Sequence, residues 1–167
     1  FYENAAVIEP IQICNKLTDG CDFYKIDVKE LSFENGFYML ENIKAKNVIL
    51  AQGVSSSLVE IPYMKIAPIF GLRIDVKTTT KVPFNIHKSI SISTNKQDGT
   101  LSIGATHERH DNEKMECLTT CDKCSFYINS DEAQIKTLLK QADELIKLDD
   151  LEVIKSYKGA RATIKSY

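Results

Sequence analysis

The sequence contains no run of 18 apolar residues, so it predicts no membrane-spanning helix. Its 21 basic and 23 acidic residues nearly balance, and the net charge of −2 gives no broad cationic field for non-specific binding of DNA. The five cysteines do not form an even-numbered disulfide framework, which favours a reducing compartment. We therefore predict a cytoplasmic protein whose partners include neither a membrane nor DNA.

Both ends of the sequence resemble segments from the interior of a longer chain. The chain begins at Phe1 without an initiator methionine or a signal peptide, and it stops at Tyr167 within a segment that is expected to be structured. With 43% hydrophobic and 26% charged residues, the composition is that of an ordinary soluble globular domain. A chain of 167 residues can bury a core without disulfides. We therefore expect a folded fragment of a longer protein.

The N-terminal third shows one helical pattern and several strand patterns. Apolar residues at helical spacing predict a helix over 8–17, with a proline in its first turn. The alternating segment 23–28 predicts a strand. The Asn-Gly dipeptide at 35–36 predicts a hairpin, because both turn residues must take positive φ. The apolar run 47–51 predicts a buried strand with both faces covered.

The remainder predicts a second, antiparallel sheet. Strands are expected at 66–76 and in the alternating run 87–94, and the Asp-Gly dipeptide at 98–99 turns the second of these into a strand at 100–106. A last strand is expected at 151–157. Strands outnumber helices, so we predict an α+β fold in which helices back an antiparallel sheet.

A polar, cysteine-containing insertion is expected at 107–129, followed by a helix that Ser130 caps. Acidic residues in the first turn of this helix suit the helix dipole. Its apolar residues recur at helical spacing and predict the side that packs on the sheet. This stripe consists of Ile135, Leu138, Leu139, Ala142, Leu145 and Ile146.

Four short motifs follow one another along the chain, namely Asn47–Gly53, Ala67–Gly71, Leu101–Thr106 and Lys158–Arg161. Their order and spacing resemble the later part of flavin-dependent amine oxidases of the D-amino-acid-oxidase and glycine-oxidase superfamily. This resemblance implies FAD as the cofactor of the intact protein. It also implies an antiparallel substrate domain attached to a partial α/β FAD-binding domain. The glycines of the second and third motifs are expected to let their strands bend around the pocket.

The resemblance divides the chain into three parts. Residues 1–60 are expected to be a remnant of the FAD-binding domain. Residues 61–160 are expected to be the substrate-binding domain, with the insertion at 107–129. Residues 161–167 would begin the return to the FAD-binding domain. Because the Gly-x-Gly-x-x-Gly fingerprint of such domains is absent, we expect this fragment alone to bind FAD poorly and to be inactive.

Arg161 is the candidate catalytic residue. A guanidinium offers a planar fork that binds a carboxylate through two parallel hydrogen bonds. The resemblance assigns this role to Arg161, with Gly159 letting the chain turn tightly, whereas the simpler alternative is a surface arginine after a strand. The resemblance also makes Ala51, Gln52 and Gly53 candidates for FAD binding, because a glycine there lets the backbone approach the cofactor.

A group of histidines and cysteines forms a candidate zinc site. These residues lie within 18 positions, and zinc takes four such ligands, but their spacing matches no standard zinc finger. The cysteine spacing also occurs in radical S-adenosylmethionine enzymes, whose barrel needs far more residues than follow here. An alternative function is therefore a zinc-binding interaction domain without catalysis, and the simplest interpretation is a polar loop with free thiols. The candidate ligands are His107, His110, Cys117, Cys121 and Cys124.

Within the superfamily, three features are most similar to one branch. They are the Gly-Ala-Thr-His-Glu segment at 104–108, the cysteine-containing insertion and the helix before Gly-x-Arg. The branch is the flavin half of bifunctional tRNA 5-methylaminomethyl-2-thiouridine biosynthesis proteins, whose other half is an S-adenosylmethionine-dependent methyltransferase. This resemblance implies tRNA as partner and the oxidative removal of a carboxymethyl group from 5-carboxymethylaminomethyl(-2-thio)uridine at the wobble position.

The alternative is a glycine- or sarcosine-type oxidase that acts on a small amino acid. Both reactions oxidise a glycine unit that carries a carboxylate, so Arg161 would serve either of them. Ser91 stands near the place where glycine-oxidase-like members have a tyrosine that points into the pocket. Its smaller side chain suggests a roomier pocket and favours the larger substrate.

Overall fold

The computed structural model describes residues 8–54, 59, 65–94, 96, 98–109 and 131–165. The chain forms two compact units, Phe1–Leu50 and Ala51–Tyr167. Both contain a helix and antiparallel strands, so the predicted α+β class is confirmed. In the described part of the chain, no helix is long and apolar enough to cross a membrane.

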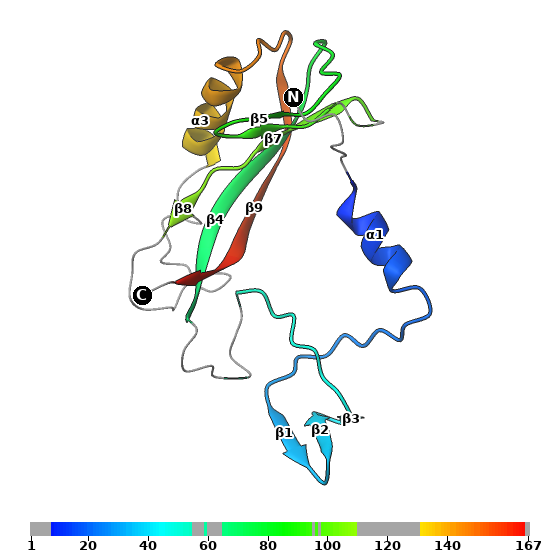
Figure 1. The fold of residues 1–167 in the computed structure, drawn as a ribbon. Helices are drawn as coiled ribbons and strands as arrows, with labels where there is room; N and C mark the ends of the chain where they lie inside the picture. The colour runs from blue at the N-terminus through cyan, green and yellow to red at the C-terminus, as the bar shows by residue number, and fades with distance from the viewer. Residues whose placement is uncertain are drawn as a thin grey trace. The chain divides into compact units, whose positions relative to one another are not determined.

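The first unit begins with helix α1, Pro10–Leu17, which confirms the predicted helix (Figure 1). Proline is tolerated at the first helical position because its missing N–H would have no partner there. The prediction of strands at 23–28 and 47–51 is wrong, because the structure shows both segments as irregular. Ile49 is 93% exposed, and no described strand pairs with its segment. An apolar run becomes a buried strand only where neighbours satisfy its backbone groups and cover its faces.

A three-stranded antiparallel sheet completes the first unit. The predicted hairpin is confirmed, because Asn35 and Gly36 take φ values of 50° and 82° between its first two strands. Such positive φ values are typical of the tight turns that suit the twist of paired strands. The strands are β1 (Leu31–Glu34), β2 (Phe37–Leu40) and β3 (Ile43–Ala45).

The second unit is built on a six-stranded antiparallel sheet with β4 at its centre (Figure 1). β9 pairs with β4 along its whole length, while β7 and β8 pair with successive parts of β4 on the other edge. β5 and β6 extend the sheet beyond β7. The elements are β4 (Lys65–Lys77), β5 (Ile86–His87), β6 (Ser91–Ile92), β7 (Thr100–Gly104), β8 (Glu108–Arg109), α3 (Asp131–Asp143) and β9 (Glu152–Lys165).

One face of this sheet is apolar and is covered by α3. Leu138 and Ala142 of the helix are fully buried, and the other residues of the predicted stripe are partly buried against the same core, which confirms the stripe. On the sheet, the register places apolar residues of β4 opposite apolar residues of β7. The fully buried residues of these two strands are Phe70, Leu72, Ile74, Val76, Leu101 and Ile103.

The opposite face of the sheet carries polar residues and glycines. Side chains alternate between the two faces along a strand, and residues directly opposite one another on paired strands share a face. The register therefore places one set of residues on the face away from α3, which we call the polar face. It consists of Gly71, Arg73, Asp75, Ser91, Ser102, Gly104, Lys155, Tyr157, Gly159 and Arg161.

The sequence predicts one strand over the alternating run 87–94, but this prediction is wrong. The segment contributes instead to the short hairpin of β5 and β6. Lys88 donates its N–H to the carbonyl of Ile90 at 3.0 Å, which closes the connecting loop. Ile90 is only 3% exposed, so the loop turns this apolar side chain into the core. The turn at 98–99 is confirmed by the φ of 79° at Gly99.

β9 continues through Gly159 to Lys165, so the tight turn expected before Arg161 is wrong. Every residue of β4 has a partner in β9, and this pairing keeps the segment extended. The bulge in the pair lies between Asp75 and Val76 and not at Gly71, where a bend was expected.

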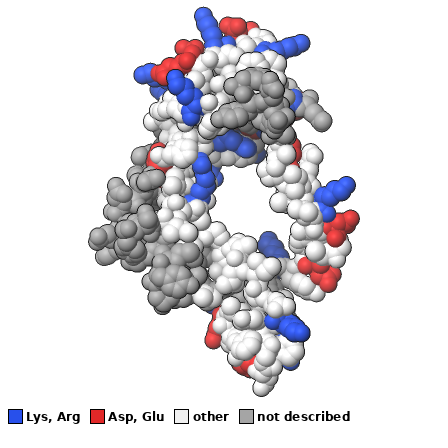
Figure 2. Space-filling model, in the orientation of Figure 1, with Lys and Arg blue, Asp and Glu red and all other residues white. Residues whose placement is uncertain are grey.

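The expected insertion begins with strand β8, which pairs with β4. Residues 110–130 lie outside the described residues, and with them four of the candidate zinc ligands and Ser130. In the view of Figure 2, basic and acidic side chains are mixed over the end of the second unit where α3 terminates.

The packing of α3 on the sheet leads to a stability prediction. Leu138→Ala should lower the free energy of unfolding by about 2–5 kcal/mol, because a fully buried leucine is replaced by a cavity. Urea denaturation monitored by circular dichroism measures this change. Lys136→Ala, at an exposed position of the same helix, is the control and should change stability by less than about 0.5 kcal/mol. Equal effects of the two variants would contradict the described packing.

Candidate functional site

Arg161 lies on the polar face, opposite Ile69 of β4, and is exposed. Its Nη1 atom lies 3.2 Å from Nε2 of His107, in the connection between β7 and β8. A guanidinium can only donate hydrogen bonds, so Nε2 is the acceptor and the proton of the neutral ring is on Nδ1. His107 therefore orients the guanidinium without neutralising its charge, which leaves Arg161 able to bind an anion.

Gly71 explains how the loop and the guanidinium reach this position. A Cβ atom at Gly71 would lie 2.7 Å from the carbonyl oxygen of Thr106 and 3.2 Å from Nη2 of Arg161. Thr106 is fixed to β4, because Leu72 donates its N–H to Oγ1 of Thr106 at 2.9 Å and accepts from the N–H of Thr106 at 3.0 Å. The absence of a side chain at Gly71 thus lets the guanidinium lie against the backbone of β4.

Gly159 is the register partner of Gly71, but its surroundings differ. No heavy atom lies within 4 Å of the position that a Cβ atom would take at Gly159. The backbone of β9 is therefore open beside the guanidinium of Arg161. A small carboxylate-bearing group could lie on this glycine and reach the donors of Arg161.

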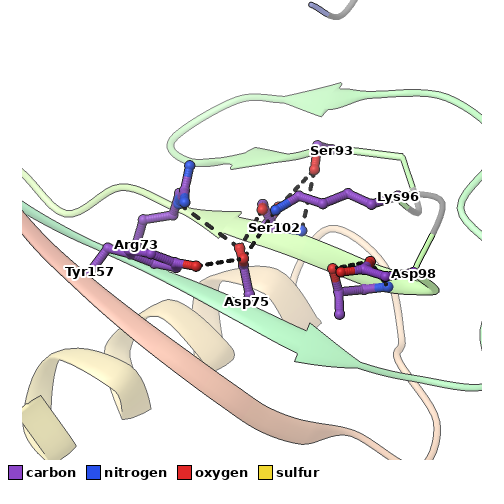
Figure 3. A network of polar contacts seen from close by, with 8 residues as sticks. Arg73, Asp75, Ser93, Lys96, Asp98, Ser102 and Tyr157 are labelled. Carbon is purple, nitrogen blue, oxygen red and sulfur yellow. Dashed lines mark hydrogen bonds and ion pairs between the residues drawn. The ribbon is translucent and has the colours of Figure 1, made fainter. Parts of the chain in front are cut away.

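A network of polar side chains surrounds Asp75 on the same face (Figure 3). Asp75 is 6% exposed. Its Oδ2 atom accepts from Nζ of Lys96 at 3.0 Å and from the hydroxyl of Tyr157 at 3.3 Å, and its Oδ1 atom accepts from the hydroxyl of Ser102. Burial of such a carboxylate is tolerated because these donors replace its hydration.

The same contacts set the protonation of Asp75. Burial raises the pKa of the carboxyl, but the hydrogen bonds from Ser102 and Lys96 and the positive charges of Lys96 and Arg73 outweigh it. The pKa of Asp75 therefore lies below its ordinary value, and the group is a carboxylate at neutral pH. A permanent negative charge thus lies beneath the cations of the polar face.

Two cations lie over the ring of Tyr157. Cζ of Arg73 is 4.4 Å and Nζ of Lys155 is 4.8 Å from the ring centroid, distances at which a cation is attracted to an aromatic face. Sequence patterns did not identify this group as part of a site. The available signal was the pair of charged residues, Arg73 and Asp75, within the otherwise uncharged segment 66–76 of strand β4.

The candidate FAD-binding residues begin the second unit and are irregular, not the end of a strand. Gly53 takes a φ of 60°, and no atom lies within 4 Å of the position of its missing Cβ. Its backbone is therefore open to a ligand, which fits a dinucleotide contact. In the described residues, no group of three or more His, Cys, Asp or Glu residues could hold a metal ion.

A hollow of about 550 Å³ lies between α3 and the connection that holds His107. Its described lining offers hydroxyl and amide groups and the carboxylate of Glu108, but neither lysine nor arginine. The carboxylate of a ligand would therefore bind more favourably at the polar face, where Arg161 is exposed, than in this hollow. The lining residues are Ser89, Ala105, Thr106, His107, Glu108, Ala133, Gln134, Thr137 and Gln141.

The chain has the fold of part of an amino acid oxidase of known structure. That structure is glycine oxidase from Bacillus cereus ATCC 14579, which matches with a TM-score of 0.59 and 19% identity. The match covers 83% of this chain but 38% of the oxidase, so this chain spans less than half of that protein. No family model and no curated protein sequence matches the chain. The likeness establishes the fold and agrees with the predicted helix-backed antiparallel domain.

The two paired glycines provide a matched test of the site geometry. Gly71→Ala should destabilise the protein by about 1–3 kcal/mol, because the methyl group would displace Thr106 and the guanidinium of Arg161. Gly159→Ala should change stability by less than about 0.5 kcal/mol, because its methyl group meets open space. Chemical denaturation of both variants measures the difference. Equal destabilisation by the two substitutions would contradict the described geometry.

Asp75 gives a pH-dependent prediction. Asp75→Asn should cost about 1–3 kcal/mol at neutral pH, because it removes the charge that pairs with Lys96 and Arg73. Since the pKa of Asp75 is lower in the folded than in the unfolded state, this stability is fully present above the unfolded pKa. It is lost as the pH falls below about 4 and through the folded pKa.

Unfolding free energies of the wild type and Asp75→Asn between pH 3 and pH 7 measure this effect, and the difference between them should shrink on acidification. Asp143→Asn, at an exposed position of α3, is the control and should leave stability unchanged within about 0.5 kcal/mol. A cost of Asp75→Asn that is constant over this pH range would contradict the ionised network.

Proposed function

We propose that this chain forms the substrate-binding part of an FAD-dependent oxidoreductase that acts on the C–N bond of a glycine unit. The observation that carries the proposal is Arg161, which is exposed on the polar face, held by the neutral ring of His107, and next to the open backbone of Gly159. The fold shared with a glycine oxidase supports the same class of reaction.

Arg161 would bind the substrate carboxylate through two N–H groups and so fix the direction of the adjoining carbon–nitrogen bond. His107 keeps the guanidinium in place before the substrate binds, which reduces the ordering cost of binding. FAD, when bound, would supply the acceptor of the hydride that leaves the carbon beside nitrogen. Ala51, Gln52 and Gly53 are the residues of this chain that we propose to contact it.

A more specific proposal concerns the substrate. Ser91 is paired with Gly104, which is paired with Arg73, so Ser91 belongs to the polar face. A serine near the place of the tyrosine of glycine-oxidase-like members has a smaller side chain than that tyrosine, and this supports a substrate larger than free glycine. We propose the 5-carboxymethylaminomethyl group of wobble uridine in tRNA, whose carboxymethyl group would be removed before a methyltransferase acts. Glycine or sarcosine is the alternative substrate.

The experiment uses the full-length protein that contains this chain. Its visible flavin absorbance is followed without oxygen after addition of tRNA that carries carboxymethylaminomethyluridine, with glycine and sarcosine in parallel. We expect the tRNA to bleach the flavin, and Arg161→Gln to lower kcat/KM by about 100-fold or more, because the carboxylate loses both charged hydrogen bonds. Lys140→Gln on α3 is the control and should react like the wild type.

The outcomes separate the proposals. Bleaching by glycine or sarcosine and not by tRNA would replace the tRNA substrate with a free amino acid. An unaltered rate in Arg161→Gln would refute the carboxylate-binding role. Absence of a flavin spectrum in the full-length protein would refute the oxidoreductase proposal as a whole.

A further inference from the structure

The polar face bears a second guanidinium, on the far side of Gly159 from Arg161. Gly159 lies between Arg161 and Tyr157 on β9, and each of these neighbours on the same face is roughly 7 Å away along the strand. Arg73 is the register partner of Tyr157 and lies over its ring. The open backbone at Gly159 is therefore bounded by Arg161 at one end and, at the other, by Tyr157 with Arg73 over its ring.

The positive charge of Arg73 is only partly compensated by its neighbours, so the guanidinium can also bind an anion. Its Nε atom lies 3.9 Å from Oδ1 of Asp75, which is an ion-pair distance but too long for a hydrogen bond. Asp75 also neutralises Lys96, at 3.0 Å, so one carboxylate serves two cations. Asp98, the other carboxylate drawn in Figure 3, accepts hydrogen bonds from Thr100 at the turn, and its charge also acts on Lys96. Two carboxylates thus face the three cations Arg73, Lys96 and Lys155, and the side chain of Arg73 is 47% exposed.

The surroundings of Arg73 also fix its position. A Cβ atom at Gly104, its partner on β7, would lie 2.9 Å from Cβ and Cγ of Arg73, so the glycine makes room for the side chain. The ring of Tyr157 supports the guanidinium plane at 4.4 Å, and Asp75 holds the Tyr157 hydroxyl. An arginine held in this way loses little conformational entropy when it binds an anion.

We propose, building on the proposed function, that Arg73 determines specificity by binding a second anionic group of the substrate while Arg161 holds the glycine carboxylate. The second group is a carboxylate or a phosphate, since a guanidinium fork recognises both. Arg73 is in register with Tyr157, four residues from Arg161, so the two Cα positions are roughly 13 Å apart along the strands. The substrate therefore carries its second anion several bonds from the glycine unit.

The test uses N-substituted glycines whose alkyl chains end in a carboxylate, a phosphonate or a neutral amide at equal length. Their dissociation constants for the full-length protein are measured by calorimetry. We expect at least one anionic ending to bind about tenfold more tightly than the amide. The ending with the larger preference identifies the natural group as a carboxylate or a phosphate.

Variants of Arg73 test whether this residue causes the preference for an anionic ending. Arg73→Gln should abolish it while binding of the amide ligand changes by less than about twofold, and Arg73→Lys, which keeps the charge, should retain part of it. Lys140→Gln is again the control and should keep the full preference. Equal affinity of wild-type protein for all three endings would overturn the proposal. Equal weakening of all three ligands by Arg73→Gln would do so too, because it would show that Arg73 acts through the fold.

Failure of the proposed function itself is recognised separately. If none of the ligands binds, or if Arg161→Gln binds all of them as well as the wild type does, the glycine-carboxylate site is wrong and the proposal for Arg73 fails with it. Binding that depends on Arg161 but shows no preference for an anionic ending overturns the Arg73 proposal alone.

Discussion

The pairing of β4 with β9 is the constraint on which the rest of the second unit depends. All 13 residues of β4 have a register partner in β9, from Lys65 opposite Lys165 to Lys77 opposite Glu152. A slip of one residue would exchange the two faces of a strand. The observed register keeps the apolar residues of β4 toward α3 and places Arg161 on the same face as Arg73. Core and candidate site are therefore two consequences of one alignment.

The bulge between β4 and β9 keeps both the apolar core under α3 and the polar face intact. Asp75 is opposite Lys155, while Val76 is opposite Val153, so Ile154 is the extra residue of β9. Ile154 is 45% exposed, whereas Val153 packs against the core. The bulge thus leaves Ile154 unpaired and exposed, while Lys155 stays on the polar face and Val153 stays beneath α3.

The elements predicted well from the sequence are those whose signals are local. The turns at Asn35-Gly36 and Asp98-Gly99 depend on the backbone freedom of adjacent residues, and the stripe of α3 depends on spacing within one helix. The apolar run that includes Ile49 has a strand-like composition, but a strand also needs partners, and these are set by the chain as a whole. The continuation of β9 beyond Gly159 escaped prediction for the same reason, since β4 supplies its partners.

Prediction of the candidate site follows the same division. Arg161 was identified through a resemblance in motifs, but its contact with His107 was not, because the two residues are 54 positions apart. The sequence groups His107 with the cysteines that follow it as a candidate zinc ligand, and in the structure its Nε2 atom accepts from Arg161. The network of Asp75 joins residues up to 82 positions apart, and its strand residues come from β4, β7 and β9, so it depends on the register of three strands.

The polar face also shows how a sheet can hold cations ready for a ligand. Recognition of an anion is strongest when the donors are oriented before it arrives, and loops supply such order poorly. Here Arg73 is fixed by a strand glycine, an aromatic ring and a buried carboxylate, all of which belong to the sheet. Burial of Asp75 would be unfavourable alone, but one of the donors that offset it is the hydroxyl of Tyr157, whose ring supports the cations of Arg73 and Lys155. Stability and preorganisation of this face therefore come from the same contacts.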